Sequence, residues 1–247
     1  MSTVKTLARA VLGSGGYDAL KRRYWRSNLS ELAMLYGTDK WGLHRYAQHY
    51  QKHFWTLRNR PISLLEIGVG GHADPAAGGQ SLRMWKAFFP KGRIYGIDLH
   101  DKRAHEEDRI RIFQGSQADP DFLRGVIDEI GSPDIIIDDG SHICEHVSVS
   151  FQTLFPLLRE NGIYAIEDLQ TSYWKEFGGS WPGRKPHTSM EMLKEMVDGL
   201  NWEEIVDRPE AAFDRSIVEI CFYHNLAFIR KGKNAEGTNV SNRHIVG

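Results

Sequence analysis

Acidic side chains and a histidine follow two short hydrophobic runs of the chain. Asp138–His142 comes after three consecutive isoleucines, and Glu167-Asp168 ends another apolar run. Three carboxylates in one place, here Asp139, Glu167 and Asp168, repel one another unless a cation lies between them. Oxygen-only ligands suit a hard cation, Mg²⁺ or Ca²⁺, better than zinc. We therefore predict a divalent-metal site at these three residues. The alternative is that the carboxylates cap helices or line another ligand's site.

His142 stands three residues after Asp139, directly beside the predicted metal ligands. An imidazole titrates near neutral pH and serves as a general base when it reaches the proton to be removed. A lone histidine is more often structural, but this one lies at the focus of the predicted site. We predict that His142 is the base, and that the following His146 belongs to the surrounding structure.

Glycines and a further acidic residue indicate a second, adjoining ligand site. Glu66-Ile67-Gly68-Val69-Gly70 ends the first predicted strand, and Asp98 ends the second, 30 positions after Gly68. Glycines let the backbone approach a ligand closely, and an acidic residue at the second strand end accepts hydrogen bonds from ribose hydroxyls. The pattern predicts a nucleoside-containing ligand. A glycine turn beside a solvated aspartate is the alternative.

The spacing after Gly68 favours S-adenosylmethionine over a dinucleotide. The motif G-x-G-x-x-G brings the N-terminus of a helix to a pyrophosphate. Here Ala73 stands at the third glycine position, and about ten residues separate Gly70 from the helix predicted to begin at Ser81. S-adenosylmethionine has no phosphate and needs no such helix. Glu66 also suits its cationic sulfonium and amino groups.

The elements that position these groups alternate between strands and helices. Strands are predicted over 62–68, 93–98, 110–114, 134–138 and 162–167, and helices over 81–89, with Ser81 as N-cap, 119–130, 145–158 and 187–207. This alternation predicts an α/β, Rossmann-like fold with a mostly parallel seven-stranded sheet. Together with the predicted S-adenosylmethionine site, it indicates the fold of class I methyltransferases. A last pair over 217–220 and 225–229 is expected to form an antiparallel edge. In such sheets, ligands bind outside the carboxyl ends of the strands.

We predict three regions along the chain. Residues 1–60 are N-terminal helices for a cap or an oligomer contact, 61–232 form the methyltransferase domain, and 233–247 are a polar tail. Aromatic residues at helical spacing in the first region, Tyr46, Tyr50, Phe54 and Trp55, are expected to be core. Phe177–Pro186 is expected to be a flexible loop and a candidate lid. Tyr173, Trp174 and Trp181 are either core or surfaces on which a sugar stacks.

The amino-acid composition narrows the kinds of partner that the protein binds and the cellular compartment in which it lies. The 31 basic and 32 acidic residues give a net charge of −1, so nucleic acid is not a favoured partner. No apolar run approaches the ~18 residues of a membrane span, and no signal peptide is recognisable at the N-terminus. Two cysteines are too few for a disulfide framework and fit a reducing compartment. We expect a cytoplasmic protein.

The motifs together resemble the family of metal-dependent sugar O-methyltransferases. The matching segments are Leu65–Gly70, Gly79–Trp85, Gly96–Asp98, Asp138–His142 and Ile166–Asp168, preceded by Tyr36–Lys40, and the resemblance covers roughly residues 30–230. It implies that Asp139, Glu167 and Asp168 bind Mg²⁺ and that His142 is the base. The residues expected to hold S-adenosylmethionine are Tyr36, Thr38, Lys40, Glu66, Gly68, Gly70, Ser81, Asp98, Ser116, Gln117 and Asp138.

The resemblance implies methyl transfer to a sugar hydroxyl of a glycoside, either an antibiotic deoxysugar or a methylmannose-type oligosaccharide. A catechol-like phenol is an alternative acceptor, because vicinal hydroxyls chelate metal in both cases. A nicotinamide-dependent oxidoreductase is an alternative enzyme class. A donor-binding module without turnover is a third possibility, against which the acid cluster with His142 argues, since binding alone needs no base. We expect a homo-oligomer.

Overall fold

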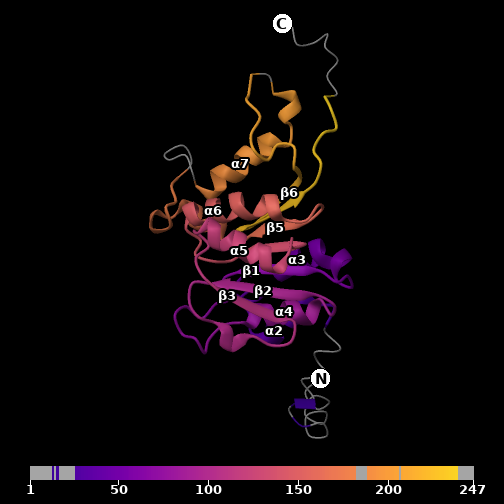
Figure 1. The fold of residues 1–247 in the computed structure, drawn as a ribbon, viewed down its shortest axis with the longest axis vertical. Helices are drawn as coiled ribbons and strands as arrows, with labels where there is room; N and C mark the ends of the chain where they lie inside the picture. The colour runs from indigo at the N-terminus through magenta and orange to yellow at the C-terminus, as the bar shows by residue number, and fades with distance from the viewer. Residues whose placement is uncertain (1–12, 14, 17–25, 182–187, 206, 239–247) are drawn as a thin grey trace.

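A seven-stranded sheet runs through the computed structural model, which describes residues 13, 15–16, 26–181, 188–205 and 207–238. The strand order is β3-β2-β1-β4-β5-β7-β6 (Figure 1). The strands are β1 (Ser63–Ile67), β2 (Arg93–Asp98), β3 (Ile110–Gln114), β4 (Ile135–Asp138), β5 (Ile163–Ile166), β6 (Ile217–Tyr223) and β7 (Leu226–Lys231). The first five pair in parallel, whereas β7 is antiparallel to β5 and β6 is antiparallel to β7. The predicted fold class and its antiparallel edge are confirmed.

Helices cover both faces of the sheet. One face carries α2 (Leu29–Tyr36), α3 (Ala47–Phe54) and α4 (Gln80–Phe88), and the other carries α5 (Pro120–Ile130), α6 (Cys144–Leu154) and α7 (Ser189–Gly199). Successive strand residues point to opposite faces, so Leu64 joins the first buried cluster and Leu65 the second. Figure 1 shows α4 beside β2 and β3, with α2 next to α4, and α7 beside β6 and α6.

Short 3₁₀ helices complete the secondary structure of the described residues. They are η1 (Trp55–Leu57), η2 (Arg103–His105), η3 (Phe155–Leu157), η4 (Leu169–Tyr173), η5 (Lys175–Phe177) and η6 (Trp202–Glu204). The helix predicted over 145–158 therefore ends at Leu154 and continues as η3, which contains Pro156. Proline has no backbone N–H to donate, so it cannot continue the helical hydrogen bonding.

The prediction that Ser81 caps the following helix is wrong. Gly79 occupies the N-cap position of α4 with a φ of 76°, a left-handed conformation that favours glycine. The Ser81 hydroxyl instead donates a hydrogen bond to Glu66 Oε2 at 2.7 Å. Ser81 thus links the first turn of α4 to the end of β1, next to the predicted donor site.

The aromatic residues at helical spacing are core, with one exception. Tyr46, Tyr50 and Phe54 are buried as predicted, but Trp55 is 52% exposed, so the prediction is wrong for that residue. Most of the helical prediction for residues 1–35 lies outside the described residues, as do 182–187 of the candidate lid and 239–247 of the tail. No described helix is both long and apolar enough to cross a membrane.

The strand order reverses around β1, and this reversal places the site. β2 lies on one side of β1 and β4 on the other, which creates a crevice at their carboxyl ends. Backbone pairing continues one residue beyond the strands: Gly68 N–H donates to Ile97 O, and Asp139 N–H donates to Ile67 O. Glu167 N–H likewise donates to Asp138 O. The backbone of Gly68, Asp139 and Glu167 is therefore fixed by the neighbouring strands at the point where each strand ends.

Candidate active site

A cavity of about 670 Å³ opens at the carboxyl edge of the sheet. Seven of the residues predicted to hold the donor line it: Thr38, Gly68, Gly70, Ser81, Asp98, Ser116 and Gln117. Asp139, His142 and Asp168 line the same cavity. Among the described residues, Tyr36, Lys40, Glu66, Asp138 and Glu167 do not line it. The structure therefore joins most of the predicted donor residues to two of the predicted metal ligands and the predicted base.

The glycine turn after β1 brings backbone to the cavity wall. Gly68 has a φ of 94°, and a Cβ at this position would lie 2.1 Å from the carbonyl oxygen of Asp139. A Cβ on Gly78 would lie 2.5 Å from the carbonyl oxygen of Gly70. Only glycine fits such close backbone contacts. The turn after β1 and the turn after β4 are thus packed directly against each other.

Buried Lys102 ties down the long loop between Gly70 and α4. Its Nζ donates hydrogen bonds to the carbonyl oxygens of Asp74, at 2.5 Å, and Ala77, at 2.9 Å. The loop brings the backbone of Gly71 to the cavity, while α4 begins only at Gln80. This geometry agrees with the expectation from spacing that a helix N-terminus does not follow Gly70 directly.

Asp98 lies at the end of β2 and also fixes the glycine turn. Its Oδ2 accepts a hydrogen bond from Val69 N–H at 3.0 Å, and its Oδ1 accepts one from His100 N–H at 2.9 Å. A carboxylate oxygen has more than one acceptor position. Asp98 therefore both shapes the turn and presents acceptor oxygens to the cavity.

Asp138 is buried behind the cavity, where it organises its neighbours. It accepts hydrogen bonds from the hydroxyl of Ser150 and from Gln117 Nε2, the latter at 3.1 Å. Gln117 Oε1 in turn accepts from Ser141 N–H at 2.7 Å. Burial raises the pKa of Asp138, and the hydrogen bonds oppose that rise. Asp138 thus holds Gln117 and the Ser141-His142 turn in place rather than reaching into the cavity itself.

Lys40 lies among three of the carboxylates, fully buried. Its Nζ is 2.6 Å from Glu167 Oε1, 2.7 Å from Asp139 Oδ2 and 3.3 Å from Glu66 Oε1. Burial alone would lower the pKa of Lys40, but the attraction of Asp139, Glu167 and Glu66 outweighs burial and raises that pKa well above its usual value. The side chain is therefore an ammonium that compensates part of the acidic charge.

Glu167 faces the interior, on the side of Lys40. Its Oε1 accepts hydrogen bonds from Lys40 Nζ and from the Tyr50 hydroxyl, both at 2.6 Å. Burial and the neighbouring Asp139 carboxylate raise the pKa of Glu167 well above its usual value, against the opposing effect of Lys40. Through Tyr50, the helix α3 thus holds the Glu167 carboxylate in place from the interior of the protein.

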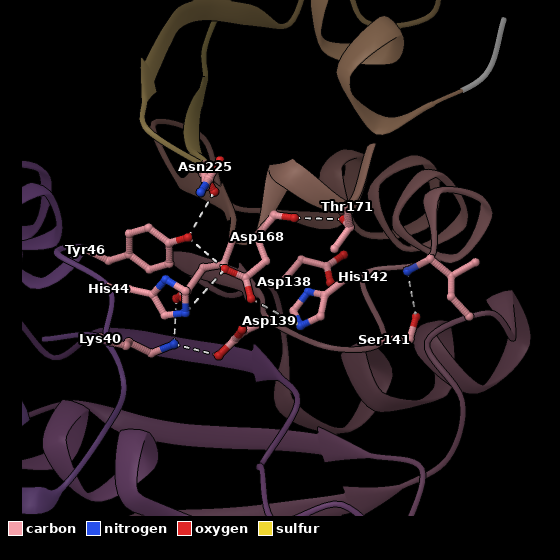
Figure 2. A network of polar contacts seen from close by, with 12 residues as sticks. Lys40, His44, Tyr46, Asp138, Asp139, Ser141, His142, Asp168, Thr171 and Asn225 are labelled. Atoms are coloured by element: carbon pink, nitrogen blue, oxygen red, sulfur yellow. Dashed lines mark hydrogen bonds and ion pairs between the residues drawn. The ribbon is translucent and has the colours of Figure 1, made fainter. Parts of the chain in front are cut away.

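Asp168 stands between two imidazoles and a phenol, as Figure 2 shows. Its Oδ1 accepts a hydrogen bond from the Tyr46 hydroxyl at 2.7 Å. His142 Nε2 lies 3.7 Å from Asp168 Oδ2, and His44 Nε2 lies 3.9 Å from Asp168 Oδ1. Both imidazole distances exceed a hydrogen bond. The two imidazoles therefore lie close to Asp168 without being hydrogen-bonded to it.

Sequence reasoning missed three contributors to this site. It assigned Tyr46 and Tyr50 to the core, which is correct for their rings, but their hydroxyls also hold Asp168 and Glu167. It did not consider His44. The only available signal was that two members of the buried aromatic stripe carry hydroxyls, and a buried hydroxyl needs a hydrogen-bond partner.

The donor atoms present fit a hard divalent cation. One ligating atom each from Asp139, His142 and Asp168 lies within 4.8 Å of the others, and the same holds for Glu66, Asp139 and Glu167. Glu66 Oε1 is buried and accepts no hydrogen bond in the structure. Carboxylate oxygens dominate both groups, as Mg²⁺ prefers. In the cavity, the Asp139 and Asp168 carboxylates thus offer ligands of suitable chemistry, and His142 lies beside them as the candidate base.

Comparison with known proteins identifies similar enzymes. The chain is 47% identical over 216 residues to 8-demethyl-8-alpha-L-rhamnosyl tetracenomycin-C 2'-O-methyltransferase of Streptomyces olivaceus, covering 86% of this chain and 57% of that protein. It is 48% identical over 217 residues to mycinamicin VI 2''-O-methyltransferase of Micromonospora griseorubida, covering 86% of this chain and 54% of that protein. The chain therefore spans little more than half the length of these relatives. No family model matches it.

A solved structure supports the same relationship. The MycE methyltransferase of the mycinamycin biosynthetic pathway, in complex with Mg, SAH and mycinamycin VI, is 48% identical and superposes with a TM-score of 0.82. The match covers 85% of this chain and 55% of the MycE chain. The chain is thus a homologue of glycoside O-methyltransferases and has the fold of the S-adenosylmethionine-dependent methyltransferases.

Proposed function

We propose that this protein is an S-adenosylmethionine- and Mg²⁺-dependent O-methyltransferase that acts on a sugar hydroxyl of a glycoside. One observation carries the proposal: the glycine turn, Asp98, Asp139, Asp168 and His142 converge on a single cavity at the carboxyl edge of the sheet. The curated relatives that match are named O-methyltransferases of glycosylated compounds, and MycE was solved with Mg and SAH.

The donor would lie along the β1 and β2 ends of the cavity. Asp98 would accept hydrogen bonds from the ribose hydroxyls, and Gly68 and Gly70 would let the backbone approach. Thr38, Ser81, Ser116 and Gln117 would complete the donor site. We place Tyr36, Lys40, Glu66 and Asp138 behind it as supports, since they lie outside the cavity lining.

The metal would be held by Asp139 and Asp168, and Glu167, predicted as the third ligand, would support Asp139 from the interior, where its Oε1 is hydrogen-bonded to Lys40. Bound Mg²⁺ would supply Lewis-acid stabilisation of negative charge on an acceptor oxygen. His142 lines the cavity next to these carboxylates, so its Nε2 is placed to accept the proton of the acceptor hydroxyl. The hydroxyl oxygen then bonds to the methyl carbon as the carbon–sulfur bond breaks, leaving S-adenosylhomocysteine.

The protein's own contribution is largely geometric. An alcohol is about as weak an acid as water, whose pKa is ~15.7, so a positioned base is needed. General-base assistance typically gives ~10²–10⁴-fold, and alignment of oxygen and methyl supplies much of the remainder. The hydrogen bonds of Tyr46 to Asp168 and of Tyr50 to Glu167 fix the carboxylates for this task.

A glycoside is the acceptor that best fits the surroundings of Asp168. Tyr173, Trp174 and Trp181 follow it in the chain and are 41%, 46% and 70% exposed, so these rings are not core. Exposed aromatic faces in this segment suit stacking against a sugar or an attached apolar group. Vicinal hydroxyls on the sugar would then reach the carboxylate edge of the cavity.

The test is methyl transfer to a panel of acceptors that includes rhamnosides, other deoxyhexosides, methylmannosides and a catechol. We expect methyl ether formation on one sugar class, loss of turnover in EDTA and recovery with Mg²⁺. Thermal-shift titration should show stabilisation by S-adenosylhomocysteine, about 2.7 kcal/mol at 100 times its dissociation constant, and none by NAD. Stabilisation by NAD alone, or methylation of the catechol alone, would contradict the proposal.

A further inference from the structure

Asp139 is shared by two groups of ligating side chains. The outer group, Asp139 with His142 and Asp168, lines the cavity. The inner group joins Asp139 to Glu66 and Glu167, which lie behind the cavity wall: Glu66 is fully buried and Glu167 is 3% exposed. In each group the ligating atoms lie within 4.8 Å of one another. Two neighbouring cation positions are therefore built around one carboxylate.

The ammonium of Lys40 fills the inner position. It contacts all three carboxylates of the inner group, at 2.6, 2.7 and 3.3 Å, and its side chain is 0% exposed. Figure 2 shows Lys40 approaching Asp139 from the side opposite His142. A side chain of this protein thus supplies the positive charge at the inner position, and a chelator cannot remove it.

The inner group would otherwise attract a metal of its own. Three clustered carboxylates, two of them buried, repel one another strongly without a cation, and all-oxygen ligand sets bind hard divalent ions. Shared carboxylates are found in two-metal sites, where the ions lie ≈ 3.5–4 Å apart. A second ion in the inner position would draw Asp139 away from the cavity, where the proposed base lies.

We propose that Lys40 is a positioning residue: its ammonium occupies the inner cation position, so that the protein takes a single divalent ion, at the outer position beside His142. The proposal rests on the proposed function, because it requires that a divalent ion binds at the outer position. It changes the role expected for Lys40 from holding the donor to selecting where the metal binds. Lys40 touches neither reacting group; it acts through Asp139 and Glu167.

The test counts bound ions with Mn²⁺ as probe, by electron paramagnetic resonance of the free ion. We expect one Mn²⁺ per chain in the wild type and two in Lys40→Met, whose neutral, flexible side chain no longer supplies a positive charge at the inner position. Lys102→Met is the matched control, because Lys102 is equally buried but donates to the carbonyl oxygens of Asp74 and Ala77. This control should bind one ion.

The outcomes separate the two proposals. If the wild type binds no Mn²⁺, the metal dependence of the proposed function fails, and this inference with it. If the wild type and Lys40→Met both bind one ion with the same affinity, metal dependence stands and the role of Lys40 is overturned. Mn²⁺ should also raise the melting temperature of Lys40→Met more than that of the wild type, since the ion replaces a missing charge.

A second pair of variants keeps the test decisive if Lys40→Met does not fold. Glu66→Gln alters only the inner position, so the wild-type count of one Mn²⁺ and its affinity should persist. Asp168→Asn alters only the outer position and should weaken Mn²⁺ binding by at least ~10-fold. Equal losses in both variants would show that the two positions are not separate, and would overturn the proposal.

Discussion

His142 and Asp168 face each other at the cavity edge, and both have left-handed backbone conformations. Their φ angles are 57° and 52°, and His142 Nε2 lies 3.7 Å from Asp168 Oδ2 (Figure 2). Such conformations are uncommon outside glycine and cost of order 1–3 kcal/mol each. Each residue lies in the turn that follows a parallel strand, β4 or β5. Both turns thus contain a residue in a strained backbone conformation, and in this conformation the His142 imidazole and the Asp168 carboxylate face the same part of the cavity.

Replacing His142 with alanine should remove the base and leave donor binding intact. We expect kcat to fall by ~10²–10⁴-fold, with the dissociation constant for S-adenosylhomocysteine unchanged. His44→Ala is the matched control, because His44 Nε2 lies 3.9 Å from the other oxygen of Asp168 but, among the described residues, His44 does not line the cavity. It should lose less than ~10-fold. A larger loss in His44→Ala than in His142→Ala would assign the base to His44.

Asp168→Asn and Asp168→Ala should separate charge from backbone conformation. Asparagine tolerates the left-handed region and still offers an oxygen to the Tyr46 hydroxyl. Asp168→Asn should therefore stay within ~0.5 kcal/mol of wild-type stability in metal-free urea unfolding, yet bind Mn²⁺ weakly. Asp168→Ala should lose a further ~1–2 kcal/mol, because alanine disfavours this conformation. Equal stability of the two variants would show that the φ of 52° carries no cost.

Much of the fold is predictable from local sequence. The three isoleucines before Asp138 form a central strand because a parallel sheet covered on both faces needs continuous apolar side chains. β2 and β3 begin and end where predicted, each followed by a polar or glycine turn. Collecting the residues at the strand ends also places Asp98, Asp139, His142 and Asp168 at one cavity.

The remainder depends on contacts between distant parts of the chain. Lys40 and Asp139 are 99 positions apart, and Tyr50 and Glu167 are 117 apart. The family resemblance of Tyr36–Lys40 predicts that Lys40 holds the donor, but packing of α2 and α3 against the sheet buries it. Ser81 has the residue type of an N-cap, yet the loop enters α4 through Gly79 and leaves its hydroxyl for Glu66.

The buried His53 predicts how stability depends on pH. Its ring stacks on Phe228 and its Nε2 lies 3.0 Å from the Tyr223 hydroxyl oxygen. Burial lowers the pKa of His53 from 6.5 to about 4. Because the folded-state pKa lies below the unfolded one, the unfolded chain takes up a proton first as pH falls. The contribution of His53 is present above about pH 6.5 and is lost as pH falls towards 4.

The measurement compares the free energy of unfolding at pH 7 and pH 5 in the wild type and His53→Phe. The whole shift in the pKa of His53 corresponds to roughly 3 kcal/mol. Only part of this titration falls between pH 7 and pH 5, so we expect a difference of ~1–2 kcal/mol. His53→Phe keeps the stacked ring and should lack that part of the decrease. An identical pH dependence in both proteins would mean that His53 is protonated as readily in the folded protein as in the unfolded chain.

Gly68→Ala should disturb the donor turn and the metal edge together. A Cβ at Gly68 would lie 2.1 Å from the carbonyl oxygen of Asp139, and the φ of 94° is strained for any other residue. We expect a loss of more than ~3 kcal/mol in stability, with weaker binding of both S-adenosylhomocysteine and Mn²⁺. Gly125→Ala is the control: its Cβ meets no atom within 4 Å, in the interior of α5. This variant should gain ~0.4–1 kcal/mol. Loss of donor binding in Gly68→Ala with wild-type Mn²⁺ affinity would show that the two turns move independently, because a rigid contact between them transmits the displacement to Asp139.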